Sequence, residues 1–206
     1  MKLYTYEPAP NGQRLKLFMD YKGIEIDTTQ IDLGTGEQLG EDYKAINPYC
    51  TIPALVLDDG TLFTEVIGIA TYLEELHPQR PLLGTGAVEK AQVISWDHRI
   101  FMMMTSAIAD ILRNAKENWK DRALPGPIDV AQLPELVERG RARLAAFYPI
   151  VDAHLAESTY VAGTSISFAD IDLFATCSFA RWVKQGIPEE CSHLQAWFDK
   201  LAAELG

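Results

Sequence analysis

The sequence is poor in cysteine and in long apolar runs, and each shortage narrows what the chain can be. Only three cysteines occur among 206 residues, with no CxxC pair, so we expect neither a disulfide scaffold nor a zinc knuckle. No 18-residue stretch is free of charges, which excludes an apolar membrane-spanning helix. The first ten residues lack the long apolar core of a signal peptide. We therefore expect a cytoplasmic protein without a membrane partner.

Basic residues are also scarce. Lys and Arg total 18 against 29 Asp and Glu, which gives a formal net charge of −11. A surface this acidic repels phosphate backbones and anionic lipids, so no nucleic-acid partner is expected. The four histidines are scattered along the chain, and no metal site is predicted.

The sequence contains enough apolar residues for a large core, and their pattern differs between the two halves of the chain. Hydrophobic residues make up 48% of the sequence, and a chain of this length can bury about 70% of its unfolded surface. The first half alternates strand-like runs with helical periodicity. Its predicted elements, in order, are a strand at 3–6, a helix from 13, a strand at 26–31, a short helix near 39–45, strands at 54–57 and 61–64, and a helix over 65–76.

The second half shows helical patterns only. A stretch with two prolines and two glycines, 77–86, separates it from the first half. Its predicted helices cover 87–119, 133–155 with a bend near Pro149, a segment starting at the capping pattern Ser167-x-x-Asp170, and 191–205. The predicted fold class is therefore α/β plus all-α, with one domain at 1–80 and a helical domain at 87–206.

A proline at the start of the third strand completes the layout of a thioredoxin-like domain. Proline is tolerated there because the first residue of a strand does not need its N–H. Only about 5–6% of X–Pro bonds are cis, so spacing alone favours a trans Ile52-Pro53 bond. A cis bond would instead turn the backbone of Ile52 outward, where it could pair with an extended peptide. The start of the first helix, 9–14, has no cysteine, so thiol chemistry here needs a thiol carried by a ligand.

Several short motifs occur in an order and spacing that is specific as a set. They are PNGQR at 10–14, INP at 46–48, TIPAL at 51–55, DDGTLFTE at 58–65, IATYLEE at 69–75 and SFADI at 167–171. With them the chain resembles a cytosolic glutathione transferase over essentially its whole length. The PNG segment is most similar to the nu-class enzymes. The resemblance implies a thioredoxin-like glutathione-binding domain followed by a helical domain that forms the electrophile site.

The resemblance also implies where glutathione, the co-substrate, binds. Its cysteinyl portion would pair with the backbone of Ile52, before the family's cis-proline, here Pro53. Glu65 would hold the γ-glutamyl ammonium, and the backbone N–H of Val66, helped by the helix dipole, would donate to the α-carboxylate. Gln38 is the looser candidate for the glycyl end. No metal is implied.

Two departures from the family pattern bear on binding and catalysis. The family usually has Ser where this chain has Val66, and losing one hydrogen bond to a carboxylate costs about 1.5–3 kcal/mol, or roughly tenfold to a hundredfold in affinity. The hydroxyl donor at the first-helix start is absent, and Ala9 stands where nu-class enzymes often have Thr. The Asn11 amide and local backbone N–H groups then remain as thiolate donors. Without the resemblance, Asn11 in a PNG turn would be an ordinary turn residue.

The run Phe101-Met102-Met103-Met104 is apolar on every face of its helix. Flexible Met side chains suit a promiscuous apolar pocket, and in the family this helix lines the electrophile site. The electrophile-site residues are therefore predicted as Phe101, Met104 and Ile108, although core or dimer packing explains the run equally well.

The predicted function is addition of the glutathione thiolate to small hydrophobic electrophiles, by a homodimer. Two alternatives stay open at this point. The nu-like PNG segment is compatible with glutathione-dependent disulfide or peroxide reduction. Val66 and Ala9 are compatible with a non-catalytic protein of the same fold that only binds ligands or partners.

Overall fold

The computed structural model describes residues 1–205, and the chain divides into two compact units. The first comprises Met1–Arg80 with Leu124–Asp129, and the second comprises Pro81–Ala123 with the chain from Val130 onward. The domain boundaries predicted from the sequence, 1–80 and 87–206, assign Leu124–Asp129 to the helical domain, whereas this segment packs with the first unit. It passes close to that unit's backbone, because a Cβ on Gly126 would lie 3.5 Å from the carbonyl oxygen of Tyr49.

The first unit is built on a four-stranded sheet with the strand order β2-β1-β3-β4. β1 runs parallel to β2 and antiparallel to β3, which is antiparallel to β4. The elements are β1 (Lys2–Thr5), α1 (Pro10–Lys22), β2 (Asp27–Gln30), a 3-10 turn (Glu37–Leu39), α2 (Glu41–Lys44), β3 (Ala54–Val56), β4 (Leu62–Thr64) and α3 (Val66–Leu76). The predicted order of strands and helices is confirmed, and it is the thioredoxin-like arrangement.

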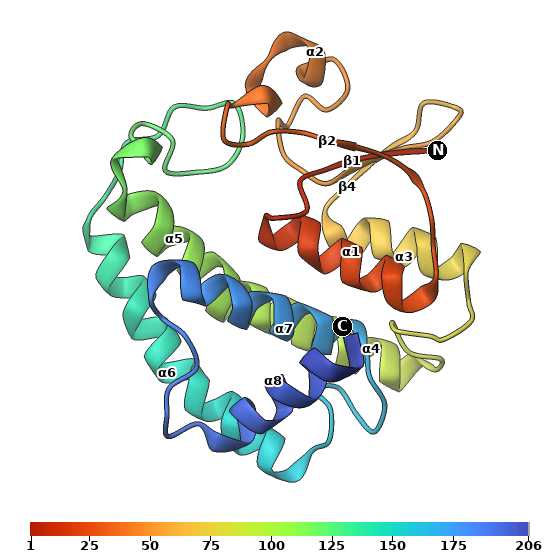
Figure 1. The fold of residues 1–206 in the computed structure, drawn as a ribbon, viewed down its shortest axis with the longest axis vertical. Coiled ribbons are helices and arrows are strands. Elements are labelled where there is room, and N and C mark those ends of the chain that lie inside the picture. The colour runs from red at the N-terminus through yellow and green to blue at the C-terminus, as the bar shows by residue number, and fades with distance from the viewer. Residues whose placement is uncertain (206) are drawn as a thin grey trace. The chain divides into compact units, whose positions relative to one another are not determined.

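Helices α1 and α3 lie side by side against one face of the sheet, and α2 lies beyond the other face (Figure 1). The core of the first unit contains Leu15 and Phe18 of α1, Leu55 of β3 and Ile69 and Leu73 of α3, all at most 1% exposed. Gly23 ends α1 in the left-handed conformation, at φ 68°, as its position in the sequence predicts.

Gly12 lets the first turn of α1 approach the chain that follows β1. A Cβ at this position would lie 2.1 Å from the carbonyl oxygen of Tyr6, a separation that no side chain tolerates. Glycine is therefore required here for packing, and it fixes how the start of α1 meets the end of β1.

Every named element of the second unit is helical, and two isolated β-bridges, Arg122 with Val130 and Tyr160 with Gly163, lie in its loops. The helical elements are α4 (Ala87–Ile100), a π-helical turn (Phe101–Thr105), α5 (Ser106–Ala115), a 3-10 turn (Glu117–Trp119), α6 (Glu135–Glu157), α7 (Phe168–Ala180), a 3-10 turn (Arg181–Val183) and α8 (Ser192–Leu205). The single helix predicted over 87–119 is thus interrupted by the π-helical turn and ends at Ala115. α6 continues through Pro149.

Helical periodicity in the sequence predicts one inward face for that helix, made of Val88, Ala91, Ile94, Phe101, Ile108, Ile111 and Leu112. For the first half of the helix this prediction is wrong. Val88 is 72% exposed, Ile94 42% and Phe101 40%, whereas the buried face of α4 carries Val93, Asp97 and Ile100. A π-helical turn inserts one residue into a helix. One period therefore does not describe both sides of the turn, and the prediction fits only the part after it, where Ile108, Ile111 and Leu112 are buried.

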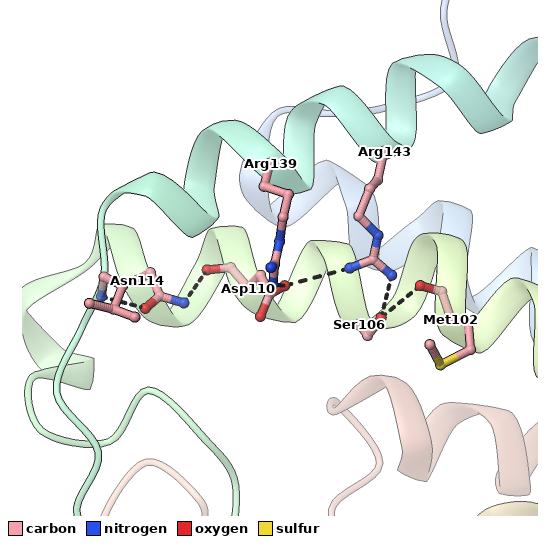
Figure 2. Close-up of polar contacts among 7 residues, drawn as sticks. Met102, Ser106, Asp110, Asn114, Arg139 and Arg143 are labelled. Atoms are coloured by element: carbon pink, nitrogen blue, oxygen red, sulfur yellow. Dashed lines mark hydrogen bonds and ion pairs between the residues drawn. The ribbon is translucent and has the colours of Figure 1, made fainter.

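α5 and α6 pack together through a close backbone approach and a polar cluster. A Cβ on Gly140 of α6 would lie 2.7 Å from the carbonyl oxygen of Ala107. Next to this contact, Asp110 of α5 accepts ion pairs from Arg139 at 3.5 Å and from Arg143 at 3.6 Å. Arg143 also donates to Ser106 Oγ at 2.8 Å, and Figure 2 shows both arginines reaching from α6 to α5.

The capping box predicted at the start of α7 is confirmed. The Ser167 side chain and backbone both engage Asp170, at 2.8 and 2.9 Å from Asp170 Oδ2. Asp170 also accepts from the Val161 N–H at 2.8 Å and from the Trp197 indole at 3.2 Å. Asp170 therefore joins the start of α7 to α8 and to the preceding loop, which is a structural role.

Candidate functional site

One end of the sheet gathers most of the residues predicted to bind glutathione. Ala54 lies opposite both Tyr4 of β1 and Thr64 of β4. The residues just beyond these, Ile52-Pro53 before β3 and Glu65 after β4, therefore leave the sheet at the same end. β1 leads from this end into the start of α1. The strand register thus gathers three chain segments that lie far apart in the sequence.

The Ile52-Pro53 bond is cis, the form that the spacing alone does not favour. Ile52 precedes β3 and makes no backbone–backbone hydrogen bond with any other residue of 1–205. Its side chain is buried in a cluster with Ala9, Ile31 and Tyr43. The side chain is thus fixed in the unit, while the backbone N–H and C=O are not used by the sheet, as binding of an extended peptide requires.

The start of α1 offers backbone donors and one side-chain amide. Ala9 is the N-cap, makes no side-chain capping bond, and is followed by a first turn without an acidic residue. The first N–H groups of such a helix are free to favour an anion. Asn11 Oδ1 accepts from Arg14 Nη1 at 3.2 Å, which leaves the Nδ2 group of Asn11 as its remaining donor.

The start of α3 has the features expected for a carboxylate-binding helix terminus. Glu65 is the N-cap and makes no side-chain capping bond, and the first turn contains no acidic residue. Glu65 is exposed and adopts φ 62° and ψ 130°, a positive-φ conformation outside the left-handed helical region that costs a residue with a Cβ about 1–3 kcal/mol. Val66 is buried and contributes only its backbone N–H. Non-glycine residues in such conformations concentrate at functional sites.

Gln38 lies in the 3-10 turn that follows β2. It is only 7% exposed, and its Oε1 atom has no hydrogen-bond partner among the described residues. A buried amide oxygen without a partner is costly, so a ligand that donates to it would be stabilising.

A tyrosine was overlooked in the sequence. Tyr6 packs against the cluster that contains Ala9 and Ile52, so a phenol lies near the start of α1, where the sequence reasoning found no hydroxyl donor. Tyr4 and Tyr6 alternate with the buried Leu3 and Thr5, and strand periodicity assigns the two tyrosines to the opposite face of the sheet. This alternation is the sequence signal that identifies Tyr6 as a candidate.

The residues predicted for the electrophile site belong to the second unit and differ in exposure. Phe101 is 40% exposed and Met102 is 47% exposed, whereas Met104 and Ile108 are fully buried. The exposed apolar surface of this segment therefore comes from Phe101 and Met102, at the start of the π-helical turn.

The remaining candidate ligands are readily accounted for. Cys50, close to the cis-proline in sequence, is buried and its thiol lies 3.8 Å from the Pro48 carbonyl oxygen. Within residues 1–205, no group of three or more His, Cys, Asp or Glu side chains is placed to hold a metal ion. No helix in this range is long and apolar enough to cross a membrane.

Two family models match the chain. The model of the N-terminal domain of glutathione S-transferases matches residues 9–76, and the model of their C-terminal domain matches residues 96–204. Among curated relatives, glutathione S-transferase 2 of Saccharomyces cerevisiae is 29% identical over 98% of this chain and 85% of its own length. The transferase GstA of Escherichia coli O157:H7 is 27% identical, covering 98% of this chain and 92% of its own.

Solved structures agree with the sequence matches. A glutathione S-transferase domain-containing protein of Marinobacter aquaeolei VT8 superposes with a TM-score of 0.89 at 28% identity and 98% coverage of both chains. Gtt2 of Saccharomyces cerevisiae gives a TM-score of 0.89 at 28% identity, with both chains covered completely. The finer resemblance of the PNG segment to nu-class enzymes stays a prediction.

Proposed function

Because the chain belongs to the glutathione S-transferase family and is a transferase that uses glutathione as its co-substrate, we propose that the tripeptide binds at the sheet end described above. The observation that carries this proposal is the convergence of unused backbone groups there. They are the N–H and C=O of Ile52 next to Pro53, the first turn of α1 and the first turn of α3.

The tripeptide lies extended along these groups. Its cysteinyl backbone pairs with Ile52 as one further strand. Its γ-glutamyl carboxylate accepts from the Val66 N–H at the positive end of the α3 dipole, and Glu65 takes the ammonium. Gln38 receives the glycyl end, where its buried Oε1 gains the N–H donor that it lacks.

The thiol then lies at the start of α1. A free thiol has a pKa of about 8.5, and hydrogen-bond donors at a helix N-terminus favour its anion. The first-turn N–H groups of α1 and the Asn11 Nδ2 group supply these donors, and the Tyr6 hydroxyl is a second side-chain candidate. The thiol proton passes to solvent, the thiolate attacks the electrophilic carbon, a C–S bond forms, and the leaving group departs with the bonding electrons.

The electrophile is a small hydrophobic molecule held against Phe101, with Met104 and Ile108 supporting this surface from the core. Replacing Phe101 by alanine is expected to raise the KM for an aryl halide and leave glutathione binding unchanged. If Phe101→Ala has the wild-type KM for aryl halides of several sizes, Phe101 is not part of the electrophile site.

The chain acts as a homodimer in the cytoplasm. Ile94 leaves an apolar side chain exposed on α4, and we assign it to the contact between the two subunits. Ile94→Lys is expected to halve the mass in light scattering. A monomeric wild-type protein would contradict the proposal.

Two side-chain variants test thiolate activation. Asn11→Ala is expected to lower kcat with 1-chloro-2,4-dinitrobenzene at least tenfold and to raise the thiol pKa in the ultraviolet titration of bound glutathione. Tyr6→Phe keeps the ring that packs against the cluster of Ala9 and Ile52 and removes only the hydroxyl. The variant with the larger rise in thiol pKa identifies the main side-chain donor. A wild-type pKa in both variants would leave activation to the backbone alone and would remove Asn11 from the mechanism.

A further inference from the structure

Two arginines of the second unit lie over the ring of the same tryptophan, and neither arginine has a carboxylate partner. The guanidinium carbon of Arg113, near the end of α5, lies 4.3 Å from the centre of the Trp119 ring. The guanidinium carbon of Arg122 lies 5.3 Å from the same ring. Within the described residues, neither arginine forms an ion pair with an Asp or Glu side chain.

The absence of an acidic partner is unusual for this chain, which carries 29 acidic and 18 basic residues. Asp121, next to Arg122 in the chain, and Asp129 in the same loop are both exposed. The two acids closest to Arg113 on the helix side are engaged elsewhere. Asp110, one turn before Arg113, pairs with Arg139 and Arg143 of α6 (Figure 2). Glu117 pairs with Lys120 at 3.9 Å. None of these acids forms an ion pair with Arg113 or Arg122 within the described residues.

The arrangement is held in place by the backbone. Arg113 Nη1 donates to the Arg122 carbonyl oxygen at 3.0 Å, which ties the loop after α5 to the end of that helix. The Arg122 N–H donates to the Trp119 carbonyl oxygen at 2.9 Å. Gln132 Nε2 donates to the Arg113 carbonyl oxygen at 2.6 Å and to that of Lys116 at 2.8 Å, which caps the end of α5.

The electrostatics at Arg113 are unfavourable in the absence of an anion. Burial, together with the positive charge of Arg122, lowers the pKa of Arg113 to about 10. Arg113 still carries its full charge at neutral pH, next to a second cation. An anion placed between the two guanidinium groups would offset this repulsion. Their cation–π contacts with Trp119 restrict the positions of both groups before an anion binds.

We infer that Arg113, Trp119 and Arg122 form a binding site for an oxyanion, a carboxylate, sulfonate or phosphate group carried by a small molecule. Guanidinium groups bind such oxygens through paired N–H donors. Arg113 keeps donors beyond the Nη1 bond to the loop, and Arg122 remains partly exposed. All three residues belong to the helical unit.

The test is a titration of the folded protein with sodium sulfate, and in parallel with sodium benzenesulfonate, at constant ionic strength set with chloride. The readout is the indole N–H resonance of Trp119 in 15N-labelled protein, assigned with Trp119→Phe. We expect a saturable shift with at least one probe, at least tenfold weaker binding in Arg122→Gln, and unchanged binding in the control Arg141→Gln. Arg141 is an exposed arginine that pairs with Glu138 on α6.

Binding of sulfate identifies the oxyanion group alone as sufficient, and binding of benzenesulfonate alone shows that the ring of the ligand also contributes. Arg113→Lys keeps the charge and removes the paired donors, so it should weaken binding without changing the sign of the shift. A resonance that does not respond to either probe, or an identical response in Arg122→Gln, would overturn the inference. Glutathione turnover, measured in the same variants, reports separately on the proposed function.

Discussion

Replacing Asp170 by alanine removes the acceptor of four hydrogen bonds at the start of α7. The carboxylate is fully buried and accepts from the Val161 N–H, the Ser167 N–H and hydroxyl, and the Trp197 indole, at 2.8 to 3.2 Å. The Ser167 hydroxyl can rotate to another partner, but the three N–H groups are fixed. They belong to residues that are 1%, 6% and 5% exposed, so water does not readily replace the lost acceptor.

The magnitude follows from two opposing effects. Each buried donor left without an acceptor costs about 1–3 kcal/mol. Against this, burial raises the pKa of Asp170 despite the hydrogen bonds it accepts. Keeping the charged carboxylate in the core therefore costs free energy, and removing the carboxylate recovers part of that cost. Three such donors cost about 3–9 kcal/mol together, and after the recovered cost of burying the charge is subtracted we expect Asp170→Ala to lower the free energy of unfolding by about 4 kcal/mol.

The assay is urea unfolding at pH 7, followed by tryptophan fluorescence and by far-ultraviolet circular dichroism. Asp199→Ala is the matched control, since Asp199 is an exposed residue of α8 whose carboxylate accepts a hydrogen bond from Gln195 of the same helix. It should change the free energy of unfolding by less than about 0.5 kcal/mol. A loss below about 1 kcal/mol in Asp170→Ala would refute the reasoning, because the buried donors would then have found other acceptors.

Three further predictions concern the first unit. Val66→Ser should lower the glutathione dissociation constant at least tenfold in calorimetry, because the serine hydroxyl adds a donor to the γ-glutamyl carboxylate. The same change buries less apolar surface and should destabilise the protein by about 1–2 kcal/mol. An unchanged affinity would contradict the proposed position of the carboxylate at the start of α3. Glu65→Gln should weaken glutathione binding by up to about fivefold, the worth of an exposed ion pair, with the effect lost at high salt. Gly12→Ala should destabilise the protein by about 3 kcal/mol or more in the same urea assay, because its Cβ meets the Tyr6 carbonyl oxygen at 2.1 Å, whereas Gly68→Ala, whose Cβ meets nothing within 4 Å, should not destabilise it.

Features set by local sequence were predictable. The helix end at Gly23 follows from the left-handed conformation that glycine adopts readily. The capping box depends only on the four consecutive residues from Ser167 to Asp170. The strands at 54–57 and 61–64 follow from the turn between them. In each of these, the residues that determine the structure lie within a few positions of each other.

Features that depend on geometry between distant residues were not predictable. The isomer of the Ile52-Pro53 bond leaves no trace in the spacing. The π-helical turn after Ile100 shifts the buried face by one residue, and no local signal in the run Phe101–Met104 distinguishes it from an ordinary helix. The Arg113 and Arg122 pair becomes visible only once the loop after α5 has folded back on the helix.

The central claim is that glutathione binds along the backbone at one end of the sheet, and a crystal structure with bound glutathione tests it most directly. The account predicts the cysteinyl N–H and C=O paired with Ile52, the γ-glutamyl carboxylate within hydrogen-bond distance of the Val66 N–H, and the sulfur at the first turn of α1. A tripeptide bound elsewhere on the protein, or a sulfur directed away from α1, would contradict it.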